Sequence, residues 1–158
     1  MEESGNIRIA GLGGMGVLKA TLILGEVLFQ EGFDVKKAEV HGMAQRGGSV
    51  SSDVRYGPAV KSPMIPAGKV DVLLSLEPEW SDTHIADVRE GGIVISPADF
   101  DVSKLKSEKG VNVAALGALS RHMPKIPLSR WYSVLRQVFP EKLWESNETA
   151  FKVGRGEI

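Results

Sequence analysis

Two glycine-rich segments carry the residues whose types and spacing suit ligand chemistry. The first begins at Gly11 and repeats glycine at Gly13 and Gly16, a G-x-G-x-x-G spacing, with Gly14 between them. It follows a β-branched run at residues 6–10 and precedes apolar residues at helical spacing, so we predict a strand-to-helix turn. Glycine lets the backbone approach a ligand or a neighbouring chain closely, and amide groups at a helix start favour an anion. The alternative is an ordinary strand-turn-helix connection that binds nothing.

The second glycine-rich segment, residues 41–48, carries several strong hydrogen-bonding side chains. His41, Gln45 and Arg46 stand among glycines after a strand predicted at residues 35–41. Open α/β sheets bind their ligands at the carboxyl ends of strands, which is where this segment would lie. Arg46 can hold a phosphate or carboxylate through two parallel hydrogen bonds. The alternative is structural: Arg46 pairs with an acidic surface residue and His41 caps the strand.

Glu77 follows the most convincing buried strand, predicted at residues 70–76. A carboxylate at the end of such a strand faces the ligand crevice of an α/β sheet, where it can bind a ligand or a partner's backbone. The alternative is that Glu77 only faces the N-terminus of a helix that we predict to start near Pro78 and to end at about Arg89.

Several chemistries lack the residues that they would need. The chain has no cysteine, which excludes disulfides, thiol catalysis and cysteine-ligated iron–sulfur clusters within it. His84 and His122 have no second ligand at metal spacing, so we predict no metal site. A nicotinamide site is disfavoured because Glu39, the nearest acidic candidate, lies inside a predicted strand and not at its end. The phosphate loop G-x-x-x-x-G-K-[ST] is also missing, since Val17 and Leu18 stand where Lys and Ser or Thr belong.

The composition fits a single domain with an ordinary core. Of the 158 residues, 42% are hydrophobic and 25% are charged, as is usual for globular proteins. A formal net charge of −1 and a pI near 6.3 give no electrostatic case for nucleic acid or an anionic membrane. The acidic start and the lack of a long apolar run predict neither a signal peptide nor a membrane span. We therefore expect one soluble, cytoplasmic domain over residues 1–158.

Strand and helix patterns alternate along much of the chain. The predicted strands lie at residues 6–10, 35–41, 49–56, 70–76 and 93–95. The predicted helices lie at residues 15–31, 78–89, 113–119, 128–138 and 140–152. Residues 99–111 show no pattern, and we predict the tail, residues 154–158, to be a disordered end or a strap onto a partner. The order of elements predicts an α/β, Rossmann-like three-layer sandwich with a mixed, largely parallel sheet covered by helices.

Six short segments, taken together, form a recognisable set of motifs. They are residues 11–17, 39–48, 51–55, 62–63, 71–77 and 147–151. The set resembles the gamma subunit, or domain, of the 2-oxoacid:ferredoxin oxidoreductases, in the same order over nearly the whole chain. The form His-Gly-Met-Ala-Gln-Arg-Gly-Gly is most similar to the indolepyruvate oxidoreductase beta subunit, which is the same module under another name. Two features depart from the family pattern: Met15 replaces a usual Gln, and the chain is shorter between Phe100 and Val111.

The resemblance implies which functions belong to this chain and which belong to its partner subunits. The family decarboxylates 2-oxoacids such as pyruvate or indolepyruvate oxidatively to acyl-coenzyme A and reduces ferredoxin. Thiamine diphosphate, Mg²⁺ and iron–sulfur clusters are then expected in alpha- and beta-type catalytic subunits and not in this chain. The chain, inactive alone, would help to form the active-site wall and the approach of coenzyme A. We expect the close-approach or coenzyme A-facing residues to be Gly13, Gly14, Gly16, Gln45, Arg46 and Glu77, and we assign no catalytic residue.

Two other hypotheses compete with this one. A free-standing, Rossmann-type nucleotide-binding enzyme would bind a dinucleotide as a monomer and lose it when Gly13 is replaced by a bulkier residue. A pure assembly scaffold would keep its turnover after Arg46→Ala once the complex has formed.

Overall fold

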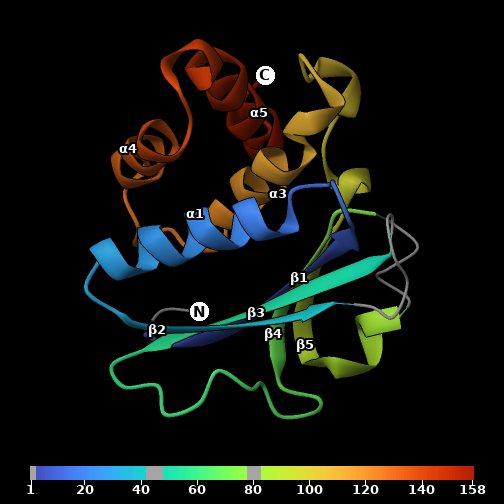
Figure 1. Cartoon of the computed structure of the whole chain (residues 1–158), viewed down its shortest axis with the longest axis vertical. Coiled ribbons are helices and arrows are strands. Elements are labelled where there is room, and N and C mark those ends of the chain that lie inside the picture. Colours follow the sequence, from blue (N-terminus) through green and yellow to red (C-terminus); the bar gives the residue numbers. More distant parts are fainter. Residues whose placement is uncertain (1–2, 42–47, 78–82) are drawn as a thin grey trace.

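A computed structural model gives the fold and describes residues 3–41, 48–77 and 83–158. A five-stranded sheet runs through the molecule in the order β2-β3-β1-β4-β5 (Figure 1). The strands are β1 (Gly5–Leu12), β2 (Asp34–His41), β3 (Ser49–Gly57), β4 (Val70–Ser75) and β5 (Val88–Ile95). The first four agree with the predicted ranges to within two residues at each end.

The sheet is mixed, as predicted. β1 runs parallel to β4, with Ile7 opposite Val72, and β4 runs parallel to β5. β3 is antiparallel both to β1 and to β2. The connection between β2 and β3 is too short for the crossover that a parallel pair needs, so these strands must form a hairpin. Two of the four strand pairs are parallel and two are antiparallel, so the sheet is less parallel than the largely parallel one that the sequence predicted.

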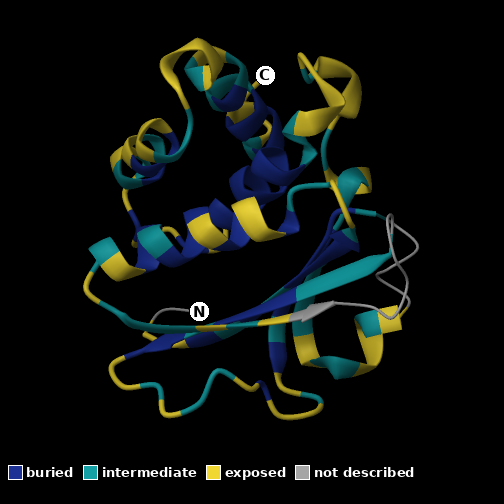
Figure 2. Ribbon diagram, in the orientation of Figure 1, coloured by how far each residue is buried: buried dark blue, intermediate teal, exposed yellow. Residues whose placement is uncertain are grey.

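The four described α-helices lie on one face of this sheet (Figure 1). They are α1 (Val17–Gln30), α3 (Val111–Ser120), α4 (Leu128–Val138) and α5 (Trp144–Arg155). Figure 2 shows the buried residues concentrated where the helices meet the sheet and each other. Ile7 and Ile9 of β1 are fully buried in this core, where Trp131 packs against Phe151 with ring centroids 5.6 Å apart. No helix in the described ranges is long and apolar enough to span a bilayer.

A loop segment covers the opposite face of the sheet. Ile65, in the connection between β3 and β4, forms a second apolar cluster with Ala10, Val70 and Leu73. Because side chains alternate between the faces of a strand, Leu73 points away from the helices while its neighbours in β4 point toward them. The α/β class is confirmed, and the layer opposite the helices is built by this loop.

The prediction of a helix up to about residue 89 is wrong at its C-terminal end. Residues 78–82 of that prediction lie outside the described residues. Thr83 and His84 are helical, and the 3₁₀ turn η1 (Ile85–Asp87) then leads directly into β5, which starts at Val88 and not at residue 93. Val88 pairs with Val70 of β4, and a register shift separates this pair from the next. The strand thus continues through Gly91 and Gly92, which the prediction treated as a break; glycine at such an irregularity is typical of a β-bulge.

Residues 99–111, which show no sequence pattern, form short 3₁₀ turns. They are η2 (Pro97–Asp99), η3 (Val102–Lys104) and η4 (Glu108–Gly110). Each begins at a capping side chain, because Ser96, Asp101 and Ser107 each accept a backbone N–H two residues later. Local side-chain caps, and not hydrophobic periodicity, therefore organise this segment.

The C-terminal segment also differs from its prediction. The helix predicted at residues 140–152 begins as a 3₁₀ turn, η5 (Glu141–Leu143), and continues as α5 to Arg155. Gly154 is buried in α5, and a Cβ added to it would lie 1.7 Å from the carbonyl oxygen of Ala114 in α3. Residues 154 and 155 are therefore not part of a disordered end, because they belong to α5 where it crosses α3 closely.

Candidate functional site

The two glycine-rich segments meet at one edge of the sheet. The N–H of Gly13 donates to the carbonyl oxygen of Gly48 at 2.9 Å, which joins the loop after β1 to the residue before β3. The loop is also closed on itself, because Met15 donates its N–H to the carbonyl of Leu12 at 3.1 Å. The thioether of Met15 accepts the N–H of Leu12 at 3.3 Å. Met15 therefore stabilises the turn from within.

Two glycines of this loop adopt left-handed backbone conformations, but their surroundings differ. Gly14 has φ +88, and no heavy atom lies within 4 Å of the position where a Cβ would be. Gly16 has φ +85, and a Cβ there would lie 2.4 Å from Nδ2 of Asn112. The loop thus presents an open surface at Gly14 and a filled one at Gly16.

A hollow of about 390 Å³ lies between the starts of α1 and α3. Its lining comprises Gly14, Met15, Gly16, Lys19, Glu108, Lys109, Val111, Asn112 and Phe139. Neither helix start has a side-chain cap or an acidic residue in its first turn, and both have a glycine as the N-cap. The helix amides and two lysines therefore give the hollow a positive local potential, which the carboxylate of Glu108 offsets only in part.

Phe139 provides the apolar part of this hollow. The ammonium group of Lys19 lies 5.6 Å from the centroid of the Phe139 ring, within reach of a cation–π contact. The hollow therefore combines an aromatic surface with positive charge, a combination that suits a ligand with both an apolar part and an anionic part.

Glu77 lies at the same sheet edge as the glycine loop. The N–H of Leu76 donates to the carbonyl of Ala10 at 2.8 Å, so the chain after β4 stays beside the end of β1. Glu77 is half-buried, and its backbone carbonyl accepts the hydroxyl of Ser75. It does not line the hollow described above. Gln45 and Arg46, the other two predicted site residues, lie outside the described residues.

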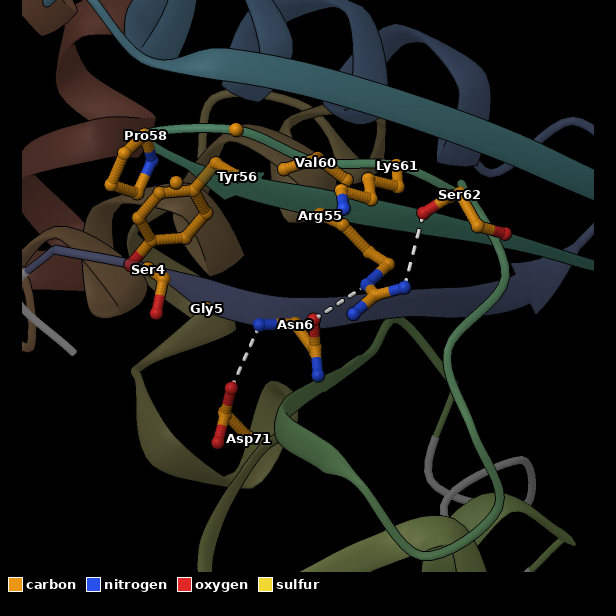
Figure 3. Close-up of a pocket in the computed structure, with 12 residues that line it drawn as sticks. Ser4, Gly5, Asn6, Arg55, Tyr56, Pro58, Val60, Lys61, Ser62 and Asp71 are labelled. Atoms are coloured by element: carbon orange, nitrogen blue, oxygen red, sulfur yellow. Dashed lines mark hydrogen bonds between the residues drawn. The ribbon is translucent and has the colours of Figure 1, made fainter.

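A second cavity, of about 530 Å³, lies near the start of β1 and the end of β3, which are the strand ends away from the glycine loop (Figure 3). Arg55 occupies its centre and donates to Oδ1 of Asn6 at 2.9 Å and to the carbonyls of Ser62 and Met64 at 3.1 and 2.8 Å. These bonds fasten the connection between β3 and β4 to the sheet. Arg55 is the last residue of the motif at residues 51–55, and these bonds give it a structural role.

Tyr56 in the same cavity has a buried hydroxyl without a hydrogen-bond partner. Burial raises the pKa of Tyr56, and the nearby carboxylate of Asp71 raises it further. The ring packs edge-on against Phe33 with centroids 5.1 Å apart. The side chain is therefore a neutral part of the core.

A charged cluster lies on the sheet away from the glycine loop. Arg8 makes two hydrogen bonds to Asp53, of 2.7 and 3.0 Å, and one of 2.6 Å to Asp87. Burial and the neighbouring Arg8 lower the pKa of His84. In the described part of the chain, no group of three His, Cys, Asp or Glu side chains could hold a metal ion. The bidentate geometry indicates that Arg8 ties β1 to β3.

Comparisons with known proteins agree with this architecture. Residues 6–104 match the family model described as pyruvate ferredoxin/flavodoxin oxidoreductase. The indolepyruvate oxidoreductase subunit IorB of Thermococcus kodakarensis is 35% identical, with 94% of this chain and 93% of the relative covered. The subunit IorB of Methanothermobacter thermautotrophicus is 45% identical, with 96% of each chain covered. The chain therefore belongs to the pyruvate ferredoxin/flavodoxin oxidoreductase family.

A solved structure identifies the type of subunit within this family. The gamma subunit of a keto/oxoacid ferredoxin oxidoreductase from Geobacter sulfurreducens has a TM-score of 0.80 and 25% identity, with 97% of both chains covered. In a 2-oxoglutarate:ferredoxin oxidoreductase from Magnetococcus marinus, the same fold spans only 31% of a longer chain, with a TM-score of 0.83. The predicted resemblance is thus confirmed, and this chain is a gamma-type subunit of a 2-oxoacid:ferredoxin oxidoreductase.

The alignments also bear on the length of the chain. Those with the two IorB relatives extend over 189 and 190 positions, although this chain has 158 residues. Gaps in this chain account for the difference, which agrees with the expectation that it is shorter than its relatives. The family match ends at residue 104, within the segment of 3₁₀ turns that precedes α3.

Proposed function

We propose that this chain is the gamma-type subunit of an indolepyruvate-type oxidoreductase and that its glycine-rich edge forms part of the wall of the shared active site. The names of the IorB relatives support the substrate class. The assignment of this edge to the active-site wall depends on the hydrogen bond from Gly13 to Gly48, because that bond joins the two glycine-rich segments beside the end of β4. Open α/β sheets bind ligands at this kind of edge.

The residues that we assign to this wall are Gly13, Gly14, Gly16, Gln45, Arg46 and Glu77. Gly13 and Gly14 let a partner chain or coenzyme A approach the backbone closely, whereas Gly16, whose Cβ position is filled by Asn112, fixes the turn. Arg46 and Gln45 supply hydrogen bonds to the coenzyme A phosphates or to the active site, and Glu77 contributes a carboxylate at the same edge. Lys19 and Lys109 would hold a phosphate group of coenzyme A at the hollow, where the helix amides add to their charge.

The redox cofactors of the reaction belong to the partner subunits in this proposal. An iron–sulfur cluster needs thiolate ligands, and this chain has no cysteine. Thiamine diphosphate with Mg²⁺ needs a set of oxygen ligands, and the described residues offer no suitable cluster of acidic groups. The residues of this chain would bind and orient coenzyme A and exclude water from the active site. Thiamine diphosphate would supply the carbanion chemistry in the partner subunit. Ferredoxin then takes electrons from the assembled enzyme.

The exposed side of α1 supports a docking role toward the catalytic subunits. Leu18, Leu22 and Phe29 are 41%, 40% and 66% exposed, and their spacing puts them on one side of the helix. Leu18 follows Gly16 by two residues, so this apolar stripe continues from the glycine loop. Burial of the stripe against the alpha- and beta-type subunits would protect it from water.

The test is reconstitution of the enzyme from separately prepared subunits. We expect the isolated chain to contain no iron, to bind no thiamine diphosphate and to reduce no ferredoxin, yet to restore indolepyruvate-dependent ferredoxin reduction to its partners. Arg46→Ala should raise the KM for coenzyme A by about one to two orders of magnitude, the scale of a lost charged hydrogen bond. Arg55→Ala, whose side chain fastens a loop at the far cavity, is the control.

Two results would contradict the proposal. Unchanged turnover and unchanged KM for Arg46→Ala in the assembled enzyme would favour a pure scaffold. Saturable dinucleotide binding by the isolated chain, lost when Gly13 is replaced by a bulkier residue, would favour the free-standing Rossmann-type enzyme.

A further inference from the structure

Asn112 is a buried polar residue beneath the glycine loop, and the function proposed above gives it no role. It lies in the first turn of α3 and is 5% exposed. Its Nδ2 donates to the carbonyl oxygen of Gly16 at 3.2 Å, and its Oδ1 accepts the N–H of Val113 at 2.9 Å. A buried amide is costly unless its groups are hydrogen-bonded, so this side chain requires the loop carbonyl as its partner.

The position of Asn112 also constrains the backbone of the loop. The carbonyl of Gly16 accepts the N–H of Ala20, the first hydrogen bond of α1, at 3.0 Å. The same oxygen accepts Nδ2 of Asn112, so a single acceptor joins the end of the loop, the start of α1 and the start of α3. The side chain of Asn112 occupies the space in which a Cβ of Gly16 would lie. The left-handed conformation of Gly16 and the placement of Asn112 therefore depend on each other.

We propose that Asn112 is a positioning residue for the active-site wall. By holding Gly16 in place, it keeps the turn at Gly14 open toward coenzyme A and the catalytic partner. This inference rests on the proposed function, in which the open turn at Gly14 contacts coenzyme A and the catalytic partner. Asn112 acts through the backbone of the loop, and the reacting atoms lie elsewhere.

The test is the substitution Asn112→Asp with Asn147→Asp as a matched control. Asn147 is also buried, at 9% exposed; its Nδ2 donates to the carbonyl of Leu143, the last residue of η5, at 3.0 Å, and it does not line the hollow at the glycine loop. Aspartate keeps the size and the acceptor of asparagine, but an ionised carboxylate cannot donate to a carbonyl. Because Asn112 also lines the hollow, Asn112→Leu, which removes the donor without adding a charge, must raise the KM as well if the lost hydrogen bond and not repulsion of a phosphate is the cause. In the reconstituted enzyme, we expect Asn112→Asp to raise the KM for coenzyme A about tenfold with little change in kcat. The control should leave both constants unchanged.

The pH dependence separates positioning from a general loss of stability. A protonated carboxyl group at position 112 regains a donor for the carbonyl of Gly16. The KM defect of Asn112→Asp should therefore shrink once the pH is low enough to protonate the new carboxyl group, whose ordinary pKa is about 3.9. A merely structural role would lower the thermal stability of both variants and would move neither the ratio of KM to kcat nor its pH profile.

A measurement on the full chain without partners makes the two proposals distinguishable. The amide of Ala20, which donates to Gly16, should exchange its hydrogen faster in Asn112→Asp than in Asn147→Asp. Equal exchange, or equal KM values for the two variants, would overturn the positioning role and leave the proposed function intact. If the wild-type chain restores no activity to its partners, the proposed function fails, and faster exchange at Ala20 would support only the loop-fixing part of the inference.

Discussion

Glycine serves opposite purposes at the α3–α5 crossing and at the loop after β1. At the crossing, a Cβ on Gly117 or Gly154 would lie 2.1 or 1.7 Å from a backbone carbonyl oxygen, of Phe151 or Ala114. At the loop, a Cβ on Gly14 would meet no atom within 4 Å. The first surface already has its partner inside the chain. The second is complete only when something outside the chain approaches it, and this difference directs the search for function to the loop.

Gly154→Ala should have the largest effect, because the clash involves backbone that cannot move without separating two helices. We expect the free energy of unfolding to fall by about 3 kcal/mol, within the range for overpacked cores, and the melting temperature to fall by roughly 6–12 °C. Thermal unfolding followed by circular dichroism measures this change. Gly156→Ala, just past the end of α5, is the control: its Cβ would meet only Nη1 of Arg121 at 4.0 Å, and its left-handed backbone should limit the loss to about 1 kcal/mol. Equal losses in the two variants would show that the crossing is less tight than the structure indicates.

Gly16→Ala should be intermediate, because its clash is with the side chain of Asn112 and its backbone is left-handed. We expect a loss of about 2 kcal/mol, of which the left-handed conformation contributes roughly 1 kcal/mol. A double-mutant cycle with Asn112→Ala measures the remainder by urea denaturation. Removing Asn112 should reduce the cost of Gly16→Ala. Strict additivity would mean that the two positions do not compete for the same space.

Gly14→Ala should have the smallest effect on stability and the most selective effect on assembly. Gly32 has a similar left-handed conformation, with φ +95 against +88, and an equally open Cβ position. Each substitution should therefore cost about 1 kcal/mol of unfolding free energy. Only Gly14→Ala should weaken reconstitution with the catalytic subunits, measured as the subunit concentration that restores half of the activity. Identical reconstitution curves would remove Gly14 from the active-site wall.

The elements with strong local signals were predictable from sequence. Apolar spacing predicted the helix at residues 128–138 at its observed limits, and the apolar run at residues 70–76 predicted β4. The strand predicted at residues 93–95 is the end of β5, but the start of β5 at Val88 was missed because it depends on pairing with β4 and not on its own pattern. The turns between β5 and α3 were missed because they depend on capping side chains and not on periodicity.

The candidate site was predictable as a set of residue types but not as an arrangement. The spacing of Gly11, Gly13 and Gly16 indicated a close-approach loop, and the structure adds the bond from Gly13 to Gly48. Asn112 gave no functional signal, because its bond to Gly16 joins residues far apart in the chain. Such tertiary contacts have no local periodicity, so only the folded chain can reveal them.

The central place of β1 in the sheet has a consequence for folding. Its two neighbours, β3 and β4, both follow it in the chain, so β1 finds no strand partner until β3, which ends at Gly57, has been synthesised. Contacts between residues so far apart slow folding. Until they form, Ile7 and Ile9, which end fully buried, stay exposed in the growing chain. This interval is when the polypeptide is most open to aggregation and when α1, formed from local contacts, can shield the strand first.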